Sequence, residues 1–124
     1  MNSNVRNVSI LKKIIGYCND INEAIAAYGN EYKIFVATKF YRYTVSLCVL
    51  QIGELVGKLT DSFTKAHPSI PWQSIKDMRN IVAHEYERFD YEILWATMQE
   101  DIPMLREYCQ KALGQLQRVE SQHK

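Results

Sequence analysis

The sequence has few of the residues and patterns that mark several large classes of protein. Its 124 residues include only three cysteines, three prolines and five glycines, and 15 Lys and Arg nearly balance 14 Asp and Glu. A formal charge of +1 argues against coating of DNA or anionic membranes, so any nucleic-acid site must be local. No apolar run is long enough for a signal peptide or a membrane helix, and we therefore expect a cytoplasmic protein without a membrane segment.

Cysteine clusters and the common enzyme signatures are also missing. Cys18, Cys48 and Cys109 are widely spaced, form no CxxC pair or zinc-type cluster, and each falls on an apolar helical stripe. We expect them to be reduced and buried. The glycine-rich phosphate loops, the HExxH zinc motif and the GxSxG nucleophile motif are absent. The sequence therefore predicts neither a metal site nor a cofactor.

The sequence does contain apolar residues at helical spacing along most of its length. They predict a helix over about residues 9–28, with Ser9 as its N-cap and Gly29 as its end. Residues 31–37 fit a short separate helix, and a long stripe from Val45 to Phe63 predicts one long helix after it. That helix carries a second apolar stripe, which indicates either the centre of a bundle or a surface shared with a second subunit.

The second half of the chain predicts two more helices after a proline-rich connector. Residues 67–72 cannot continue the preceding helix, and Pro71 suits the start of a new one that ends near residues 85–89. A last long helix begins after Asp90, with a kink expected near Pro103. The chain therefore reads as one all-α domain over residues 1–124, a bundle of four to five helices.

The residues most suited to chemistry lie within one short segment. Arg79, Asn80, His84 and Tyr86 bring a cation, an amide, an imidazole and a phenol into eight residues, a set suited to phosphate chemistry. On a regular helix Asn80 and His84 lie within about 40° of each other, whereas Arg79 lies about 140° from His84. Either the helix loosens after Ala83, or a twofold-related copy brings these groups into one shared cleft.

A purely structural interpretation of the same segment is also open. Arg79 would pair with Asp77, Glu85 or Glu87, and His84 would interact with the dipole at the C-terminal end of its helix. The other two histidines lie in the connector and in the tail, where we expect no function. Scattered cations are typical of an ordinary soluble exterior, and none is singled out among Lys33, Lys39, Arg42, Lys76 and Arg88.

The segment Arg79-Asn80-x-x-x-His84-x-Tyr86 resembles the Rx4HxY signature of the HepT toxin family, within the HEPN superfamily. The resemblance extends along nearly the whole chain. It includes Gln51-Ile52-Gly53-Glu54, the connector His67-Pro68-x-Ile70-Pro71-Trp72, Ile75-x-x-Met78, Ile93-x-Trp95 and Asp101-x-Pro103-x-Leu105.

This resemblance implies a homodimeric α-helical toxin of a type VII toxin-antitoxin system, paired with an MntA-like nucleotidyltransferase antitoxin. It implies a metal-independent endoribonuclease in which Arg79 and His84 are catalytic, Asn80 supports them, and RNA, such as tRNA or mRNA, is cut to a 2′,3′-cyclic phosphate. An imidazole with an ordinary pKa of about 6.5 can act as both acid and base near neutrality. Tyr86 would be the hydroxyl to which the antitoxin transfers AMP.

Two other classes of function remain. A non-catalytic HEPN-like helical module could serve as the partner or substrate-binding subunit of a nucleotidyltransferase. A helical adaptor that does not touch nucleic acid is the third possibility. The intact set of Arg79, His84 and Tyr86 favours the ribonuclease, because a scaffold would not need it.

Overall fold

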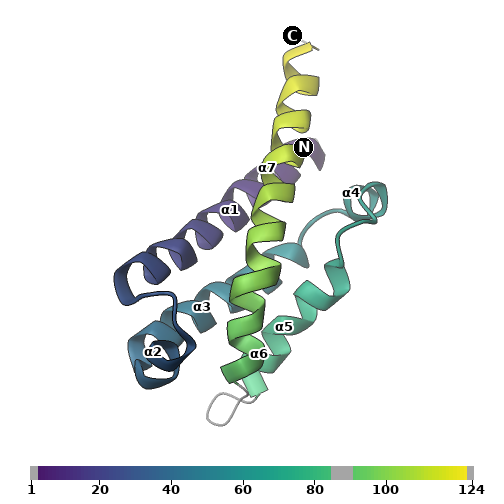
Figure 1. Ribbon diagram of the computed structural model, residues 1–124. Coiled ribbons are helices and arrows are strands. Elements are labelled where there is room, and N and C mark those ends of the chain that lie inside the picture. Colours follow the sequence, from purple (N-terminus) through teal and green to yellow (C-terminus); the bar gives the residue numbers. More distant parts are fainter. Residues whose placement is uncertain (1–2, 85–90, 123–124) are drawn as a thin grey trace.

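The computed structural model describes residues 3–84 and 91–122, and over these ranges every regular element is a helix. The four long helices are α1 (Ser3–Tyr28), α3 (Lys39–Val56), α5 (Trp72–His84) and α7 (Ile102–Gln122). Between them lie three short helices, α2 (Tyr32–Ala37), α4 (Asp61–Ala66) and α6 (Tyr91–Ala96), and a π-helical turn, η1 (Thr97–Asp101). The predicted all-α bundle is confirmed (Figure 1).

Helix α3 is the centre of this bundle. It packs against α1 on one side and α5 on the other, and α1 packs in turn against α7 (Figure 1). The main apolar stripe predicted on α3 is buried between these neighbours. The core side chains at these contacts are Leu11, Ile14, Cys18 and Ile21 of α1, Val45, Cys48, Val49 and Ile52 of α3, and Leu105 and Cys109 of α7.

All three cysteines lie in this core, as the sequence predicts. Burial raises the pKa of the Cys18 and Cys109 thiols to about 12 and that of Cys48 to about 11. A thiol with such a pKa stays protonated near neutrality and is a poor nucleophile. The cysteines therefore act as small apolar core residues.

The first helix is longer than predicted, and the proposed cap at Ser9 is wrong. Helix α1 begins at Ser3, and Ser9 lies within it on the exposed side. The additional turns are held by Asn7, whose buried side chain bonds Thr60. The predicted end is confirmed, because Gly29 follows the helix with φ of 110°, a conformation that favours glycine.

The predicted long second helix is interrupted after Val56. Asn7 accepts a hydrogen bond from the Thr60 amide at 3.2 Å and donates one to the Thr60 hydroxyl at 3.0 Å. The Thr60 hydroxyl also accepts from the Phe63 amide at 3.3 Å, which caps α4. Leu59 and Phe63 are buried, as their spacing predicted, but Leu59 lies in the turn and Phe63 lies in the new helix α4.

The connector between α4 and α5 is fastened to α7 by aromatic side chains. The His67 imidazole Nδ1 lies 2.7 Å from the Tyr108 hydroxyl, and the Trp72 indole donates to the His67 carbonyl at 2.9 Å. The Phe63 ring lies 4.4 Å from the imidazole, measured between ring centroids. These contacts give His67 a structural role in fastening the connector to α7.

A π-helical turn, η1, lies just before Pro103, where the sequence predicts a kink. The amide of Ile102 bonds the carbonyl of Thr97, five residues earlier, just before the proline that has no amide hydrogen to donate. Apolar periodicity continues across it, with Leu94, Met98, Ile102 and Leu105 all buried. The last predicted helix is thus divided into α6, η1 and α7, and its proposed cap Asp90 lies outside the described residues.

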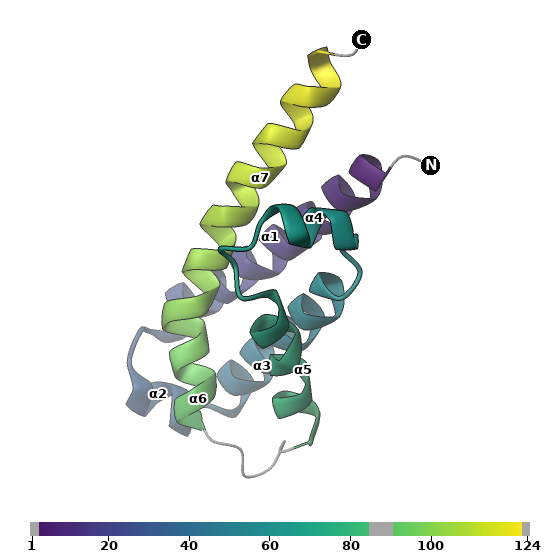
Figure 2. The same ribbon diagram turned by 90° about the vertical axis from the view of Figure 1, so that its right-hand side faces the viewer.

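The two chain termini lie at one end of the bundle, and α2 and α6 lie at the other (Figures 1 and 2). Helix α5 runs from the connector toward the end that holds α2 and α6, so its last residue, His84, lies there (Figure 2). Within the described parts of the chain, no helix is both long and apolar enough to cross a membrane.

Candidate functional site

Helix α5 carries the residues that the sequence singles out. Arg79 and Asn80 are described in full, and Asn80 is exposed. His84 is the last residue of α5, and only its backbone belongs to the described part of the structure. Tyr86 lies outside the described residues. The geometry of the candidate site is therefore built on Arg79.

Arg79 forms an ion pair with Glu54 of the neighbouring helix α3, through Nε and a carboxylate oxygen. Asp77, one of the partners considered from sequence, instead accepts a hydrogen bond from the Gln73 amide at 2.8 Å. The other two, Glu85 and Glu87, lie outside the described residues. The sequence interpretation thus missed Glu54 as a partner, because it considered only acids close to Arg79 along the chain.

The Arg79 guanidinium is held at one side and open at the other. Its Nε atom is buried, whereas the side chain as a whole is 41% exposed and that of Glu54 is 43% exposed. An ion pair this exposed contributes at most about 1 kcal/mol to stability. Its effect is chiefly to orient the guanidinium of this partly exposed side chain.

A glycine allows α3 and α5 to approach each other at Arg79. A Cβ atom on Gly53 would lie 3.0 Å from the Arg79 Cβ and 3.3 Å from the Lys76 carbonyl oxygen. A side chain at residue 53 would therefore require Arg79 or the α5 backbone to shift by a few tenths of an ångström, and a larger side chain would require more. One short segment of α3 thus supplies both the close contact, at Gly53, and the carboxylate that orients Arg79, at Glu54.

The second apolar stripe of α3 leads to this ion pair. Phe40, Tyr43 and Leu47 are 65%, 43% and 55% exposed, and Glu54 follows them on the same face at helical spacing. A groove of about 460 Å³ opens beside Leu47, between α1 and α3. Leu50, the fourth residue of the predicted second stripe, is half-buried against the core, so that face is uncovered in the single chain at Phe40, Tyr43 and Leu47.

Among the described residues, no three His, Cys, Asp or Glu side chains lie close enough together to hold a metal ion.

Comparison with known proteins identifies the family. The model of the family described as "Ribonuclease HepT-like" matches residues 11–112. The chain belongs to the HepT-like family. That match spans α1 to α7 and includes Gly53, Glu54 and Arg79.

Three curated relatives of this HepT-like chain carry ribonuclease names. "Probable ribonuclease HepT" of Thermococcus cleftensis is 34% identical over 95 residues, which cover 73% of this chain and 86% of that protein. "Putative RNase MJ0125" of Methanocaldococcus jannaschii is 28% identical over 109 residues, which cover 88% of this chain and 92% of that protein. "Putative RNase MJ1380" of the same organism is 33% identical over 76 residues and covers 61% and 70%. No solved structure matches the chain.

The close contact at Gly53 leads to a test by substitution. Gly53→Val should lower the free energy of unfolding by about 1–3 kcal/mol, because its side chain overlaps Arg79 and Lys76. Gly16→Val is the matched control, since nothing lies within 4 Å of a Cβ on that helical glycine. Urea denaturation of the two variants measures the difference, and equal midpoints would show that the α3–α5 contact tolerates a side chain.

Proposed function

We propose that this HepT-like chain is a metal-independent endoribonuclease with Arg79 and His84 as its catalytic residues. The observation that carries the proposal is the Arg79 guanidinium, fastened to Glu54 on one side and open on the other. The ribonuclease names of the relatives support the reaction class. The sequence pattern Arg79-Asn80-x-x-x-His84 supports the assignment of the residues.

Arg79 binds the phosphate at which the RNA is cut. A guanidinium remains charged at any physiological pH and offers a planar fork of N–H donors that matches two phosphate oxygens. With Nε engaged by Glu54, the terminal N–H groups are the ones presented to the phosphate. There they stabilise the negative charge that builds up as the 2′ oxygen approaches phosphorus. Glu54 acts as a positioning residue.

His84 moves the protons of the reaction. Its neutral imidazole takes the proton of the 2′-hydroxyl, the 2′ oxygen forms a bond to phosphorus, and the bond from phosphorus to the 5′ oxygen breaks. The imidazolium then gives its proton to the leaving 5′ oxygen. The products are a 2′,3′-cyclic phosphate and a 5′-hydroxyl end. Asn80, one turn before His84, supports the imidazole or the phosphate.

The working enzyme is a homodimer in which Arg79 and His84 of different copies meet. On a regular helix, residues that are five positions apart, as Arg79 and His84 are, lie about 140° from each other around the axis. The exposed stripe of Phe40, Tyr43 and Leu47 runs along α3 toward the Glu54–Arg79 pair. A second copy of the chain, related by a twofold axis beside that stripe, would cover the stripe. It would also bring two Glu54–Arg79 pairs to one cleft. The exposed Phe40 and the groove beside Leu47 leave apolar surface on this face that a second copy would bury.

In the cell this enzyme acts as the toxin of a type VII toxin-antitoxin system. An MntA-like nucleotidyltransferase neutralises it by transferring AMP to Tyr86, two residues after His84. The added phosphate charge and the bulk of the nucleotide would repel and block RNA at the cleft. The alternative is a non-catalytic helical module that binds the nucleotidyltransferase as partner or substrate-binding subunit.

Substitution of the two catalytic residues separates these functions. In the presence of EDTA, His84→Ala and Arg79→Ala should each reduce cleavage of total cellular RNA by at least about a hundredfold. Arg118→Ala, which removes an exposed arginine of α7, is the control and should cut RNA like the wild type. Gel analysis of RNA with unmodified protein measures the rates. A folded wild type that leaves RNA intact would favour the binding module.

Modification of Tyr86 has its own test. After co-expression with the neighbouring nucleotidyltransferase, intact-mass spectrometry should show the chain heavier by one or more AMP groups. Tyr86→Phe should abolish the increase. Tyr28→Phe, which alters an exposed tyrosine at the end of α1, should leave it unchanged. An unmodified wild-type chain, or AMP retained in Tyr86→Phe, would contradict the assignment.

A further inference from the structure

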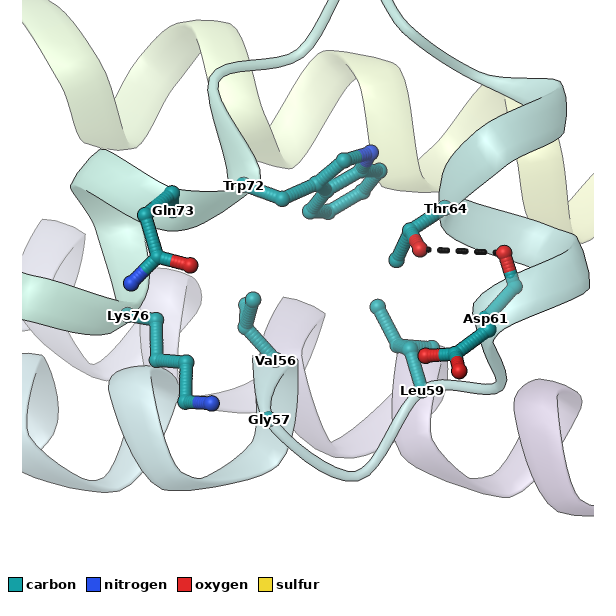
Figure 3. A pocket seen from close by; sticks show the side chains of 8 residues that line it. All are labelled: Val56, Gly57, Leu59, Asp61, Thr64, Trp72, Gln73 and Lys76. Atoms are coloured by element: carbon teal, nitrogen blue, oxygen red, sulfur yellow. Dashed lines mark hydrogen bonds between the residues drawn. The ribbon is translucent and has the colours of Figure 1, made fainter.

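A small cavity lies at the start of α5, next to the candidate site. It has a volume of about 150 Å³, is partly open to solvent, and is bordered by residues at the end of α3, in α4 and in the first turns of α5 (Figure 3). Its walls combine apolar and polar groups: Val56, Leu59 and Trp72 with Asp61, Gln73 and Lys76. Drug-sized ligands and cofactors occupy pockets of about 300–1,000 Å³, so this cavity suits a fragment such as a single base.

Lys76 places a second cation beside Arg79. It lies three residues earlier on the same helix, about 4.5 Å along the axis. Its stem passes over Gly57, where a Cβ would lie 3.4 Å from the Lys76 Cε. Within the described residues no carboxylate pairs with its ammonium. Lys76 and Arg79 therefore form a short cationic row along the α3–α5 contact, as a strand of phosphates would require.

Two polar groups on the rim of the cavity, Gln73 and Asp61, offer hydrogen-bond acceptors. The Gln73 amide nitrogen donates to Asp77, and Figure 3 shows the amide oxygen on the cavity side. The carboxylate of Asp61 is exposed at the opposite rim (Figure 3). The nearby Thr64 hydroxyl donates to the Asp61 backbone carbonyl at 3.2 Å. Acceptors of this kind recognise an amino group, such as the N4 amine of cytosine, and do not match the O4 carbonyl of uracil.

Trp72 gives the cavity a fixed flat wall. Its indole nitrogen donates to His67, and its ring packs against Phe63 and Tyr108 with centroids 5.9 Å and 6.1 Å away. These contacts hold the indole in one orientation before any ligand arrives. An aromatic wall that is already in place lowers the entropic cost of binding a planar base.

We infer that this cavity is a base-binding subsite, which accepts a cytosine in preference to a uracil in RNA lying along α5. Lys76 binds the backbone phosphate next to the one at Arg79, and Gln73 and Asp61 accept from the amino group of the base. The base belongs to a nucleotide one or two positions from the cleaved bond, since Lys76 and His84 are about 12 Å apart along the helix. This inference rests on the proposed ribonuclease function for its substrate.

Binding of mononucleotides tests the subsite without any cleavage. The chain has two tryptophans, so Trp95→Phe leaves Trp72 as the sole indole reporter. In that protein, CMP should quench the fluorescence of Trp72 with about tenfold higher affinity than UMP. Gln73→Ala should remove most of this preference, Lys76→Gln should weaken both ligands, and Lys12→Gln, an exposed lysine of α1, should change neither. If Trp95→Phe does not fold, calorimetry of the wild type makes the same comparison.

Equal affinities for CMP and UMP, or affinities that Gln73→Ala and Lys76→Gln do not change, would overturn the subsite. Cleavage of two oligoribonucleotides that differ only by cytosine or uracil beside the cut then separates the two proposals. Binding of CMP without cleavage of either strand would remove the ribonuclease and leave the subsite. Cleavage of both strands at equal rates, unaffected by Lys76→Gln, would remove the subsite and leave the ribonuclease.

Discussion

The close contact between α3 and α5 at Gly53 is the constraint on which the rest of this structure depends. Because residue 53 has no side chain, α5 approaches α3 closely. The Arg79 Cβ lies only 3.0 Å from the point that a Cβ on residue 53 would occupy. At that separation Glu54 reaches Arg79 and Lys76 crosses Gly57. One backbone contact therefore orients the proposed catalytic arginine and also the lysine of the proposed base subsite.

The same helix α3 links the core to the proposed dimer. Its inner faces bury the stripe that includes Val45 and Ile52, whereas Phe40 and Leu47 on its outer face remain exposed. Glu54 lies at the end of that outer face, so covering it with a second copy would also enclose the Arg79 pair. Helix α3 therefore contributes residues to the core, to the proposed dimer interface and, through Glu54, to the proposed catalytic cleft.

Apolar spacing predicted the helices well, because burial of one face is what most helices need. It failed where a long-range polar contact decides the backbone. Helix α3 ends at Val56, and Asn7 fastens Thr60 at the start of α4, although Leu59 and Phe63 keep helical spacing. The sequence motif predicted the residues of the candidate site. It did not predict Glu54 as the partner of Arg79, because the two are 25 positions apart and only helix packing brings them together. His84 and Tyr86 remain predictions from sequence.

A mixed dimer tests most directly whether the site is shared between two copies. One chain with Arg79→Ala and one with His84→Ala, carrying different tags, can be co-expressed and captured as a heterodimer. If Arg79 and His84 act across the twofold axis, this heterodimer keeps one intact pair of two and should cut RNA at about half the wild-type rate, while each parent homodimer is inactive. An inactive heterodimer, or none to capture, would contradict the account.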